Sequence, residues 1–347
     1  MKGVVFNGNR TLELRDFPDP NPGAGEVVLE IKASGMCGSD LHFYRAPEGA
    51  KSLGIVGDGK PVIAGHEPCG VVVARDPNLP DKVTPEGARV MCHHYHGCGI
   101  CPDCRSGWQQ LCPEGMVVYG ATAHGAHAPY MRVASSTLVA LPDTLSFSEG
   151  AAISCGTGTA FNALKRMNLN GRDSLAVFGQ GPVGLSAVMF ARELGARVIA
   201  IDISSERLKL AENFGATEFI NANQTDPIER IQDLTKGKGV NMSIECSGIS
   251  DVRAQAVRST GIWGTVCFVG EGGTVTLDVS KDINRKQLTI IGSWTFSSFG
   301  QAECAAYIAE RNIDLDRIFT HRFTLDQAEE AYKIFDQQTT GKGVFEF

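Results

Sequence analysis

The chain has 347 residues, which is enough for two hydrophobic cores because single cores usually stop growing at about 250 to 300 residues. It is 43% hydrophobic and 20% charged, with a formal net charge of −7. No run approaches the ~18 to 20 uninterrupted apolar residues of a membrane span, and no cluster of Lys and Arg offers a surface for phosphates. We therefore expect neither a membrane nor a nucleic acid among its partners.

The amino terminus, MKGVVFNGNRTLELRD, has no apolar segment behind a basic start, so nothing marks it for export and we expect a cytoplasmic location. Eleven cysteines in that reducing compartment are expected to be metal ligands, catalytic thiols or small buried packing residues. A disulfide framework is not expected.

Residues 1–150 predict a β-rich first domain, because short runs such as EVVLEIKASG and CGVVVARD are separated by Gly, Pro and Asn. The stretch 44–60, rich in Gly and Lys, predicts a mobile loop. The motifs CGSDLH and GHE, and SCGTG just beyond the domain, carry side chains able to bind a metal or move a proton: Cys37, Ser39, Asp40, His42, His66, Glu67 and Cys155. Taken singly, such residues are commonly packing or loop residues.

The segment 92–112 contains the densest cysteine motif, C-x2-C-x2-C-x7-C, formed by Cys98, Cys101, Cys104 and Cys112. Cysteines three residues apart do not easily form disulfides, whereas four thiolates can converge on one tetrahedral Zn²⁺ and leave no open position for a substrate. We therefore predict a structural zinc site, with a redox motif or an iron–sulfur ligand set as alternatives. The preceding His93, His94 and His96 are interpreted as solvated or core polar residues.

From about Asn170 the pattern changes to alternating strands and helices, which predicts a parallel, doubly wound α/β domain. The run FGQGPVG follows an apolar strand and opens a helix, and it has the G-x-G-x-x-G spacing of a dinucleotide-binding turn: Gly179, Gly181, Pro182, Val183 and Gly184. Asp202 ends the next predicted strand, where a carboxylate accepts hydrogen bonds from the adenosine ribose and repels a 2′-phosphate. NAD is therefore favoured, although Arg207 leaves NADP as an alternative.

The last third of the chain predicts further buried strands in VNMSIECSG, TVCFVG and LTIIGSW. Near the end, TLDQAEEAYKIFDQQTTGKG predicts an amphipathic helix whose apolar face contains Ala328, Ala331, Tyr332 and Phe335. Trp294 and Phe296 are interpreted either as lining the substrate cleft or as subunit-interface core. Cys69, Cys92, Cys246, Cys267 and Cys304 are interpreted as packing residues.

The order of CGSDLH, GHE, the cysteine segment and GQGPVG resembles the zinc-dependent medium-chain alcohol dehydrogenases, especially their sorbitol and threonine dehydrogenase branches. The resemblance covers nearly the whole chain. It implies a GroES-like β-rich catalytic domain at 1–150, with a structural zinc lobe at 92–112. It further implies a Rossmann NAD-binding domain at 151–290 and a final segment, 291–347, that returns to the catalytic domain. It also implies a homo-oligomer, a tetramer or a dimer.

The resemblance implies a set of residue roles. Cys37, His66 and Cys155 resemble the ligands of a catalytic zinc, and Glu67 resembles an acidic neighbour that binds zinc in some states. Ser39 resembles the hydroxyl that takes the alcohol proton, and His42 the end of a proton relay. Asp40 is expected to orient a ligand. With the cysteine segment, this predicts two Zn²⁺ per chain.

Two features depart from the family pattern. The stretch 44–60 is longer than usual, and in GATAHGAHAPY the positions commonly held by an aromatic and an acid carry His127 and Pro129. His124 and His127 either contact a polar substrate or are loop histidines hydrogen-bonded to backbone. Sorbitol dehydrogenases carry glutamate where Cys155 stands.

The predicted function is hydride transfer between a secondary alcohol, such as a small polyol or sugar alcohol, and NAD, giving the ketone. An enzyme similar to L-threonine 3-dehydrogenase is the nearest alternative. Two alternatives lie outside catalysis. A catalytically silent nucleotide sensor would lack the catalytic ligands. A protein that binds a partner through its zinc lobe would carry basic residues around the cysteine segment.

Overall fold

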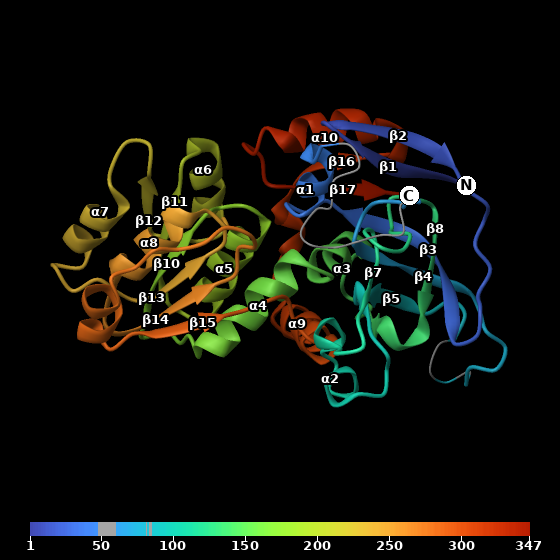
Figure 1. Cartoon of the computed structure of the whole chain (residues 1–347), viewed down its shortest axis with the longest axis horizontal. Helices are drawn as coiled ribbons and strands as arrows, with labels where there is room; N and C mark the ends of the chain where they lie inside the picture. The colour runs from blue at the N-terminus through green and yellow to red at the C-terminus, as the bar shows by residue number, and fades with distance from the viewer. Residues whose placement is uncertain (48–59, 81, 83–84) are drawn as a thin grey trace. The chain divides into compact units, whose positions relative to one another are not determined.

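The computed structural model describes residues 1–47, 60–80, 82 and 85–347 (Figure 1). The chain forms two compact units, and it passes from one to the other within helix α4 (Gly156–Met167). The first unit comprises 1–158, 296–338 and 342–347, and the second comprises 159–295 and 339–341. Most of the predicted loop at 44–60 falls on residues 48–59, outside the described part of the chain.

The first unit is built on a seven-stranded sheet with the order β16-β17-β3-β4-β5-β9, in which β8 also pairs with β3. All pairings are antiparallel except that of β16 with β17. Its strands and helices are β1 (Lys2–Gly8), β2 (Thr11–Asp16), β3 (Glu26–Gly35), α1 (Asp40–Arg45), β4 (Glu67–Arg75), β5 (Arg89–Cys92), β6 (Tyr95–His96), α2 (Pro102–Arg105), β7 (Val117–Val118), β8 (Tyr130–Ala134), β9 (Leu138–Ala140), α3 (Phe147–Ile153), α9 (Ser298–Arg311), β16 (Phe319–Phe323), α10 (Ala328–Asp336) and β17 (Lys342–Glu346).

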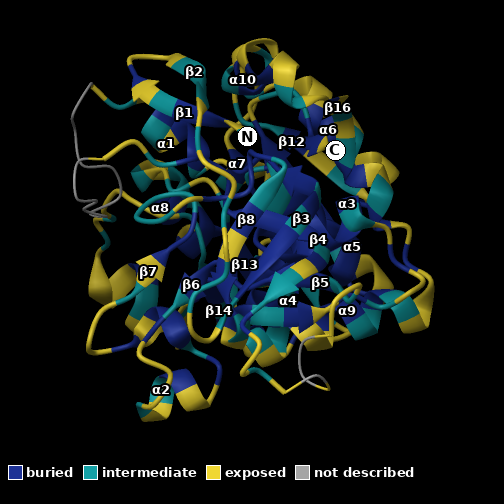
Figure 2. Cartoon of the chain, turned by 90° about the vertical axis from the view of Figure 1, so that its right-hand side faces the viewer, coloured by how far each residue is buried: buried dark blue, intermediate teal, exposed yellow. Residues whose placement is uncertain are grey.

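Strands β3 and β4 form the centre of this sheet, and Figure 2 shows them largely in the colour of buried residues. Apolar side chains of β3, including Val27, Leu29 and Ile31, pack with Val72 of β4 in one core cluster. The rigid, buried ends of these two strands carry the residues of the candidate site. A sheet buried in this way holds the chain at its strand ends in one geometry.

The C-terminal segment completes the first unit. Strand β17 pairs with β3, with Val344 opposite Gly35, so the end of the chain lies beside a strand from its beginning. Helix α10 confirms the predicted amphipathic face, because Ala328, Ala331, Tyr332 and Phe335 are all buried. They pack in one cluster with residues of β1, α1 and β17.

The second unit has a six-stranded parallel sheet with the order β12-β11-β10-β13-β14-β15. This order is that of the doubly wound dinucleotide-binding fold, as the alternating sequence pattern predicts. Its strands and helices, with the shared α4, are β10 (Ser174–Phe178), α5 (Pro182–Glu193), β11 (Arg197–Asp202), α6 (Ser205–Asn213), β12 (Glu218–Asn221), α7 (Pro227–Leu234), β13 (Val240–Glu245), α8 (Ser250–Ser259), β14 (Thr260–Phe268) and β15 (Thr289–Gly292).

One predicted buried strand is not buried. Strand β15 is the edge of the parallel sheet, and Thr289, Ile290 and Gly292 are exposed. The sequence of β15 is as apolar as that of a central strand, which is why the sequence predicts it to be buried. The strand order shows instead that β15 pairs only with β14 within the described chain, so its other edge has no neighbouring strand. Separately, none of the described helices has the length and apolar character needed to cross a membrane.

Candidate functional site

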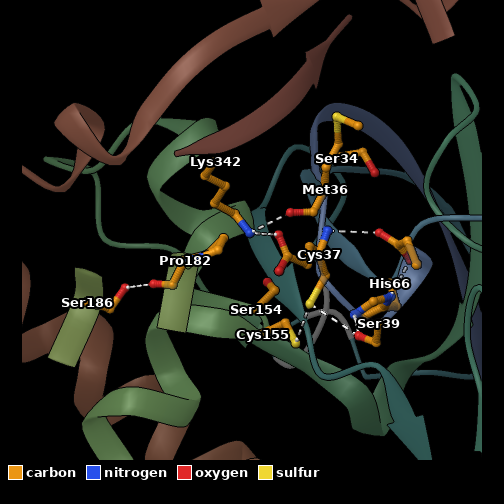
Figure 3. Close-up of polar contacts among 12 residues, drawn as sticks. Ser34, Met36, Cys37, Ser39, His66, Ser154, Cys155, Pro182, Ser186 and Lys342 are labelled. Atoms are coloured by element: carbon orange, nitrogen blue, oxygen red, sulfur yellow. Dashed lines mark hydrogen bonds and ion pairs between the residues drawn. The ribbon is translucent and has the colours of Figure 1, made fainter. Parts of the chain in front are cut away.

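Four buried side chains of the first unit gather their ligand atoms at one point: Cys37, His66, Glu67 and Cys155. These atoms all lie within 4.8 Å of one another, and the Sγ atoms of Cys37 and Cys155 are 3.8 Å apart (Figure 3). Sulfurs at about 2.3 Å from a tetrahedral Zn²⁺ lie about 3.8 Å apart. The spacing of the two thiols therefore fits a zinc site.

The sheet brings these residues together. Cys37 follows the end of β3, whereas His66 and Glu67 stand at the start of β4. The two strands are antiparallel, with Gly35 opposite Glu67, so the end of one lies beside the start of the other. A side chain at Gly35 would collide with the Glu67 carboxylate. Cys155 comes from the connection between α3 and α4.

Asp40 fixes the orientation of the His66 ring. One carboxylate oxygen lies 2.8 Å from His66 Nδ1, and the other accepts a hydrogen bond from the Cys37 backbone N–H at 2.9 Å. A carboxylate bonded to Nδ1 selects the tautomer whose Nε2 is free to bind a metal. This arrangement is the one expected of Asp40.

Ser39 lies directly against two of the candidate ligands. Its Oγ is 3.2 Å from Cys37 Sγ and 3.2 Å from His66 Nε2. Ser39 is the N-cap residue immediately before α1, but its hydroxyl makes no capping hydrogen bond to the helix. It is therefore available to a molecule bound at the ligand cluster. His42, further along α1, is exposed, and burial of part of its ring together with Arg45 lowers its pKa, so it stays neutral near pH 7.

Lys342 is a residue of the site that the sequence interpretation missed. Its Nζ forms an ion pair with the Glu67 carboxylate and donates a hydrogen bond to the Met36 carbonyl at 3.1 Å (Figure 3). Lys342 and Glu67 are both completely buried. Glu67 Oε1 accepts no hydrogen bond from the described residues. A buried acceptor left unsatisfied in this way is suited to a cation.

The pKa shifts at the site show that its acidic groups are crowded. Burial, and to a lesser degree the charge of Cys37, raise the pKa of Glu67 to about 8 against the opposing effect of Lys342. The hydrogen bond between the thiols lowers the pKa of Cys37 and raises that of Cys155. A bound divalent cation would stabilise all of these anions together. Two thiolates, an imidazole and a nearby carboxylate form a donor set that suits Zn²⁺.

The four cysteines of the segment 92–112 form a second, closed cluster. Their Sγ atoms lie within 4.8 Å of one another, with 4.0 Å between Cys101 and Cys112. Backbone N–H groups point at the sulfurs: Cys98 N–H donates to Cys112, Cys101 N–H to Cys98, and Cys104 N–H to Cys101. Such bonds favour the thiolate, and those from Ile100 and Cys101 lower the pKa of Cys98 to about 7. These residues fit one tetrahedral Zn²⁺ with no position left for a substrate.

The histidines near the cysteine segment belong mostly to the core. His93 and His94 are buried, and His96 is half-buried. His93 Nε2 bonds to the Phe296 carbonyl at 3.0 Å, and His94 Nδ1 bonds to the Ser154 carbonyl at 3.0 Å. Phe296 is completely buried against His93, so it belongs to the core of the first unit. The sequence alone suggests that it lines the substrate cleft or lies in a subunit interface, and neither description fits this position.

The glycine-rich turn of the second unit has the conformation that its spacing predicts. Gly179 has a φ of 90°, and a side chain at Gly184 would collide with the Gly179 carbonyl. Gly181 faces open space, with nothing within 4 Å of the position a Cβ would take. Pro182 and Val183 begin helix α5, whose first turn has unpaired N–H groups. This is the form of a pyrophosphate cradle.

Asp202 ends β11 beside this turn. Its carboxylate accepts hydrogen bonds from the backbone N–H groups of Gln180, at 2.6 Å, and Ser204, at 2.9 Å. Arg207 is buried; its Nε donates to the Thr340 carbonyl at 3.2 Å, while one terminal nitrogen makes no hydrogen bond within the described residues. The carboxylate is thus held in place, and the guanidinium keeps a free donor.

His124 and His127 do not form a pair. His124 is exposed and accepts a hydrogen bond from the Ile63 backbone N–H at 3.1 Å. His127 is completely buried, and its ring nitrogens bond to side chains, to Ser34 at 2.7 Å and to Tyr332 at 2.8 Å. The loop interpretation therefore describes His124 but not His127.

Comparison with known proteins agrees with this geometry. Residues 23–143 match the alcohol dehydrogenase GroES-like domain, and residues 182–311 match the zinc-binding dehydrogenase family. The chain is 39% identical to the uncharacterized zinc-type alcohol dehydrogenase-like protein YphC of Escherichia coli, over 100% of this chain and 99% of the relative.

Two named enzymes are more distant. The chain is 29% identical to the sorbitol dehydrogenase of Bacillus subtilis, over 95% of this chain and 92% of that enzyme. It is 30% identical to an L-threonine 3-dehydrogenase of Francisella tularensis, over 96% of this chain and 95% of that enzyme.

Solved structures confirm the GroES-like and Rossmann folds. The alcohol dehydrogenase TADH from Thermus sp. ATN1 matches with a TM-score of 0.89 and 29% identity, over 100% of this chain and 99% of that chain. A structure of the Escherichia coli short chain alcohol dehydrogenase rspB, complexed with NADH, matches with a TM-score of 0.87 and 25% identity, over 100% and 99%. The chain therefore belongs to the zinc-dependent medium-chain dehydrogenase/reductase family, the alcohol dehydrogenase superfamily of oxidoreductases that act on alcohols.

Proposed function

We propose that this protein is a zinc-dependent dehydrogenase that transfers a hydride from a secondary alcohol to NAD and releases the ketone. One observation carries the proposal: the ligand atoms of Cys37, His66 and Cys155 meet in a buried cluster, with the Ser39 hydroxyl 3.2 Å from His66 Nε2. Three protein ligands and a neighbouring hydroxyl are what a catalytic zinc site requires, because the fourth position then takes the substrate.

In this proposal each residue has one task. Zinc, when bound, supplies a Lewis acid that favours loss of the alcohol proton. Ser39 accepts that proton and passes it toward the exposed His42, whose lowered pKa leaves the ring neutral and able to receive it. The hydride leaves the carbon that bears this oxygen for the nicotinamide, so the products are the ketone, NADH and one proton. Glu67 is held by Lys342 beside the ligand atoms and is either a fourth ligand or a neighbour.

The cysteine segment is proposed to hold a second zinc that stabilises the fold. Its four thiols already complete a tetrahedral site. Two Zn²⁺ per chain are therefore expected.

NAD is the proposed cofactor because the Asp202 carboxylate would repel the 2′-phosphate of NADP. Two backbone N–H groups hold this carboxylate at the end of β11. The fold relative rspB was solved with NADH. The free nitrogen of Arg207 would tolerate a phosphate, which makes the ratio of the two cofactors a measurable property of this site.

The proposed substrates are small polyols, sugar alcohols or related hydroxy compounds. The sorbitol dehydrogenase relative supports this class, and the L-threonine 3-dehydrogenase relative, with a similar identity, supports a β-hydroxy amino acid as the alternative. A homo-oligomer in the cytoplasm belongs to the same proposal, and sedimentation of the purified protein would test the oligomeric state.

The test is a substrate panel assayed by NADH absorbance. Polyols, sugars and β-hydroxy amino acids are offered with NAD to the wild type, to Ser39→Ala and to Cys37→Ala. We expect the wild type to turn over one class of secondary alcohol, and Ser39→Ala to lose about 100-fold or more in kcat. Cys37→Ala should show no turnover while it still binds NAD. Full activity of Cys37→Ala would refute the mechanism. No turnover of any member by a wild type that contains both zinc ions would refute the substrate class.

A further inference from the structure

The strand order of the second unit assigns the two halves of a dinucleotide to different strands. A dinucleotide bound to this fold lies outside the carboxyl ends of the strands, across the point where the strand order reverses. That point lies between β10 and β13, which are neighbours in the sheet (Figure 1). The glycine turn after β10 and Asp202 at the end of β11 are the proposed contacts of the pyrophosphate and the adenosine. The nicotinamide end is then left to the loops that follow β13 and β14.

The loop after β13, residues 246–248, lies against the glycine turn. A Cβ placed on Gly179 would be 3.3 Å from both the Cβ atom and the backbone nitrogen of Ser247. The Cys246 N–H, at the start of this loop, donates to the Phe178 carbonyl at the end of β10, at 2.9 Å. The loop therefore borders the pyrophosphate turn on the β13 side.

The side chain of Glu245, the last residue of β13, fixes this loop. It is completely buried, and one carboxylate oxygen accepts hydrogen bonds from the backbone N–H groups of Ser247, at 2.5 Å, and Gly248, at 2.9 Å. The Ser247 hydroxyl donates to the same oxygen. Hydrogen bonds to a charged acceptor are about twice as strong as those between neutral groups. The carboxylate thus sets the path of the backbone through the loop.

Arg253 joins Glu245 to the loop after β14. The arginine lies in the first turn of α8, is buried, and pairs through Nε with the other carboxylate oxygen at 3.5 Å. One of its terminal nitrogens donates to the Gly270 carbonyl, in the loop after β14, at 2.6 Å. The two loops also touch through their backbones, because a Cβ on Gly270 would be 2.1 Å from the Gly248 nitrogen. A change in this ion pair would therefore move both loops.

We propose that Glu245 and Arg253 are positioning residues for the nicotinamide ring of the cofactor. The inference rests on the proposed binding of NAD. A buried ion pair contributes little net stability in comparison with apolar residues of the same volume. The value of this pair is geometric, since its directed bonds hold two backbone segments at the carboxyl ends of β13 and β14, where the nicotinamide would lie.

The experiment compares two ligands that differ at one end. NADH and ADP-ribose both carry the adenosine, the pyrophosphate and the second ribose, but only NADH carries the nicotinamide ring. Their dissociation constants are measured by titration calorimetry for the wild type, for Arg253→Met and for the double variant Glu245→Gln/Arg253→Met. The double variant leaves neither charge of the pair buried without its partner, so it decides the question where Arg253→Met does not fold.

Arg197→Met is the matched control in the same sheet. Arg197 pairs with Glu218 at 2.7 Å and donates to the Leu234 carbonyl at 3.3 Å, so it also joins a glutamate to a backbone carbonyl. Arg197 and Glu218 are the first residues of β11 and β12, at the amino ends of the strands. The control therefore removes the same kind of contact from the edge of the sheet opposite to the proposed cofactor site.

We expect Arg253→Met and the double variant to raise the dissociation constant of NADH by about 10-fold, the effect of losing one hydrogen bond to a charged group. The dissociation constant of ADP-ribose should change by less than about 2-fold. The fluorescence of bound NADH, which reports the surroundings of the nicotinamide ring, should shift toward that of the free cofactor. Arg197→Met should leave both constants and the emission unchanged.

Two sets of results would count against different claims. A folded wild type that binds neither ligand would refute the proposed cofactor itself. A wild type that binds NADH, together with a folded double variant whose two dissociation constants rise equally or stay unchanged, would refute the positioning inference alone. A selective loss of NADH binding in Arg197→Met, as large as that in Arg253→Met, would have the same meaning.

Discussion

The Nζ atom of Lys342 forms a fully buried ion pair with the Glu67 carboxylate, across the central strand β3 that separates their strands β17 and β4. Burial opposes the charge on Lys342, but Glu67 and Cys37 outweigh it and raise the pKa of the lysine. The last strand of the chain therefore places a permanent positive charge beside the candidate metal ligands.

The first prediction concerns this pair. Lys342→Met leaves the Glu67 carboxyl buried without its partner, so the free energy of unfolding should fall by about 3 to 5 kcal/mol in a denaturant titration. Adding Glu67→Gln to that variant should recover part of the loss. Lys333→Met, which removes an exposed ion pair with Glu329, should change stability by less than about 1 kcal/mol. Equal effects of the two lysine variants would show that the buried pair is not maintained in solution.

The second prediction separates the two metal clusters. Cys104→Ala opens the closed lobe, so metal analysis should find one zinc instead of two, and the melting temperature should fall. Hydride transfer in a single turnover should change little in the protein that remains folded. Cys37→Ala should also contain one zinc but lose turnover. A stable Cys104→Ala protein whose hydride transfer alone has collapsed would contradict the structural assignment.

The third prediction concerns cofactor preference. Asp202→Gly removes the carboxylate that Gln180 and Ser204 hold at the end of β11, so repulsion of a 2′-phosphate disappears. The ratio of kcat/KM for NAD to that for NADP should fall by about 10-fold or more, which corresponds to about 1.4 kcal/mol. Glu206→Gln, an exposed carboxylate nearby on α6, is the control. An unchanged ratio in Asp202→Gly would show that Asp202 does not meet the ribose.

The fourth prediction is a pH dependence. Burial lowers the pKa of His127 to about 4, with Asp40 opposing and His66 adding to the effect. An unfolded histidine titrates near pH ~6.5, so between these values the unfolded chain binds more protons, and stability is lost as the pH falls. The free energy of unfolding of the wild type should therefore drop by about 3 kcal/mol more than that of His127→Gln between pH ~6.5 and ~4. Parallel curves for the two proteins would show that the ring is not buried neutral.

Where ligands are close in sequence, the sequence determined the site. The spacing of Cys98, Cys101, Cys104 and Cys112 brings four sulfurs around one point through local turns, and the structure finds them within 4.8 Å. The glycines of the dinucleotide turn act in the same way, since their effect depends on backbone freedom and close approach within one strand-turn-helix unit. Motifs of this kind depend little on the rest of the fold.

The second cluster depends on the fold. Cys37, His66 and Cys155 stand out in the sequence only through a resemblance, and they meet because β3 and β4 are antiparallel neighbours and α3 packs close to both. Lys342 gave no signal in the sequence, because a lysine near the end of the chain is ordinarily explained as a surface residue. The pairing of β17 with β3 brought Lys342 to Glu67, and the packing of α10 brought Tyr332 to His127. Such contacts join residues hundreds of positions apart in the sequence. Their strength depends on burial of the polar groups in the folded protein, and a local sequence pattern contains no information about that burial.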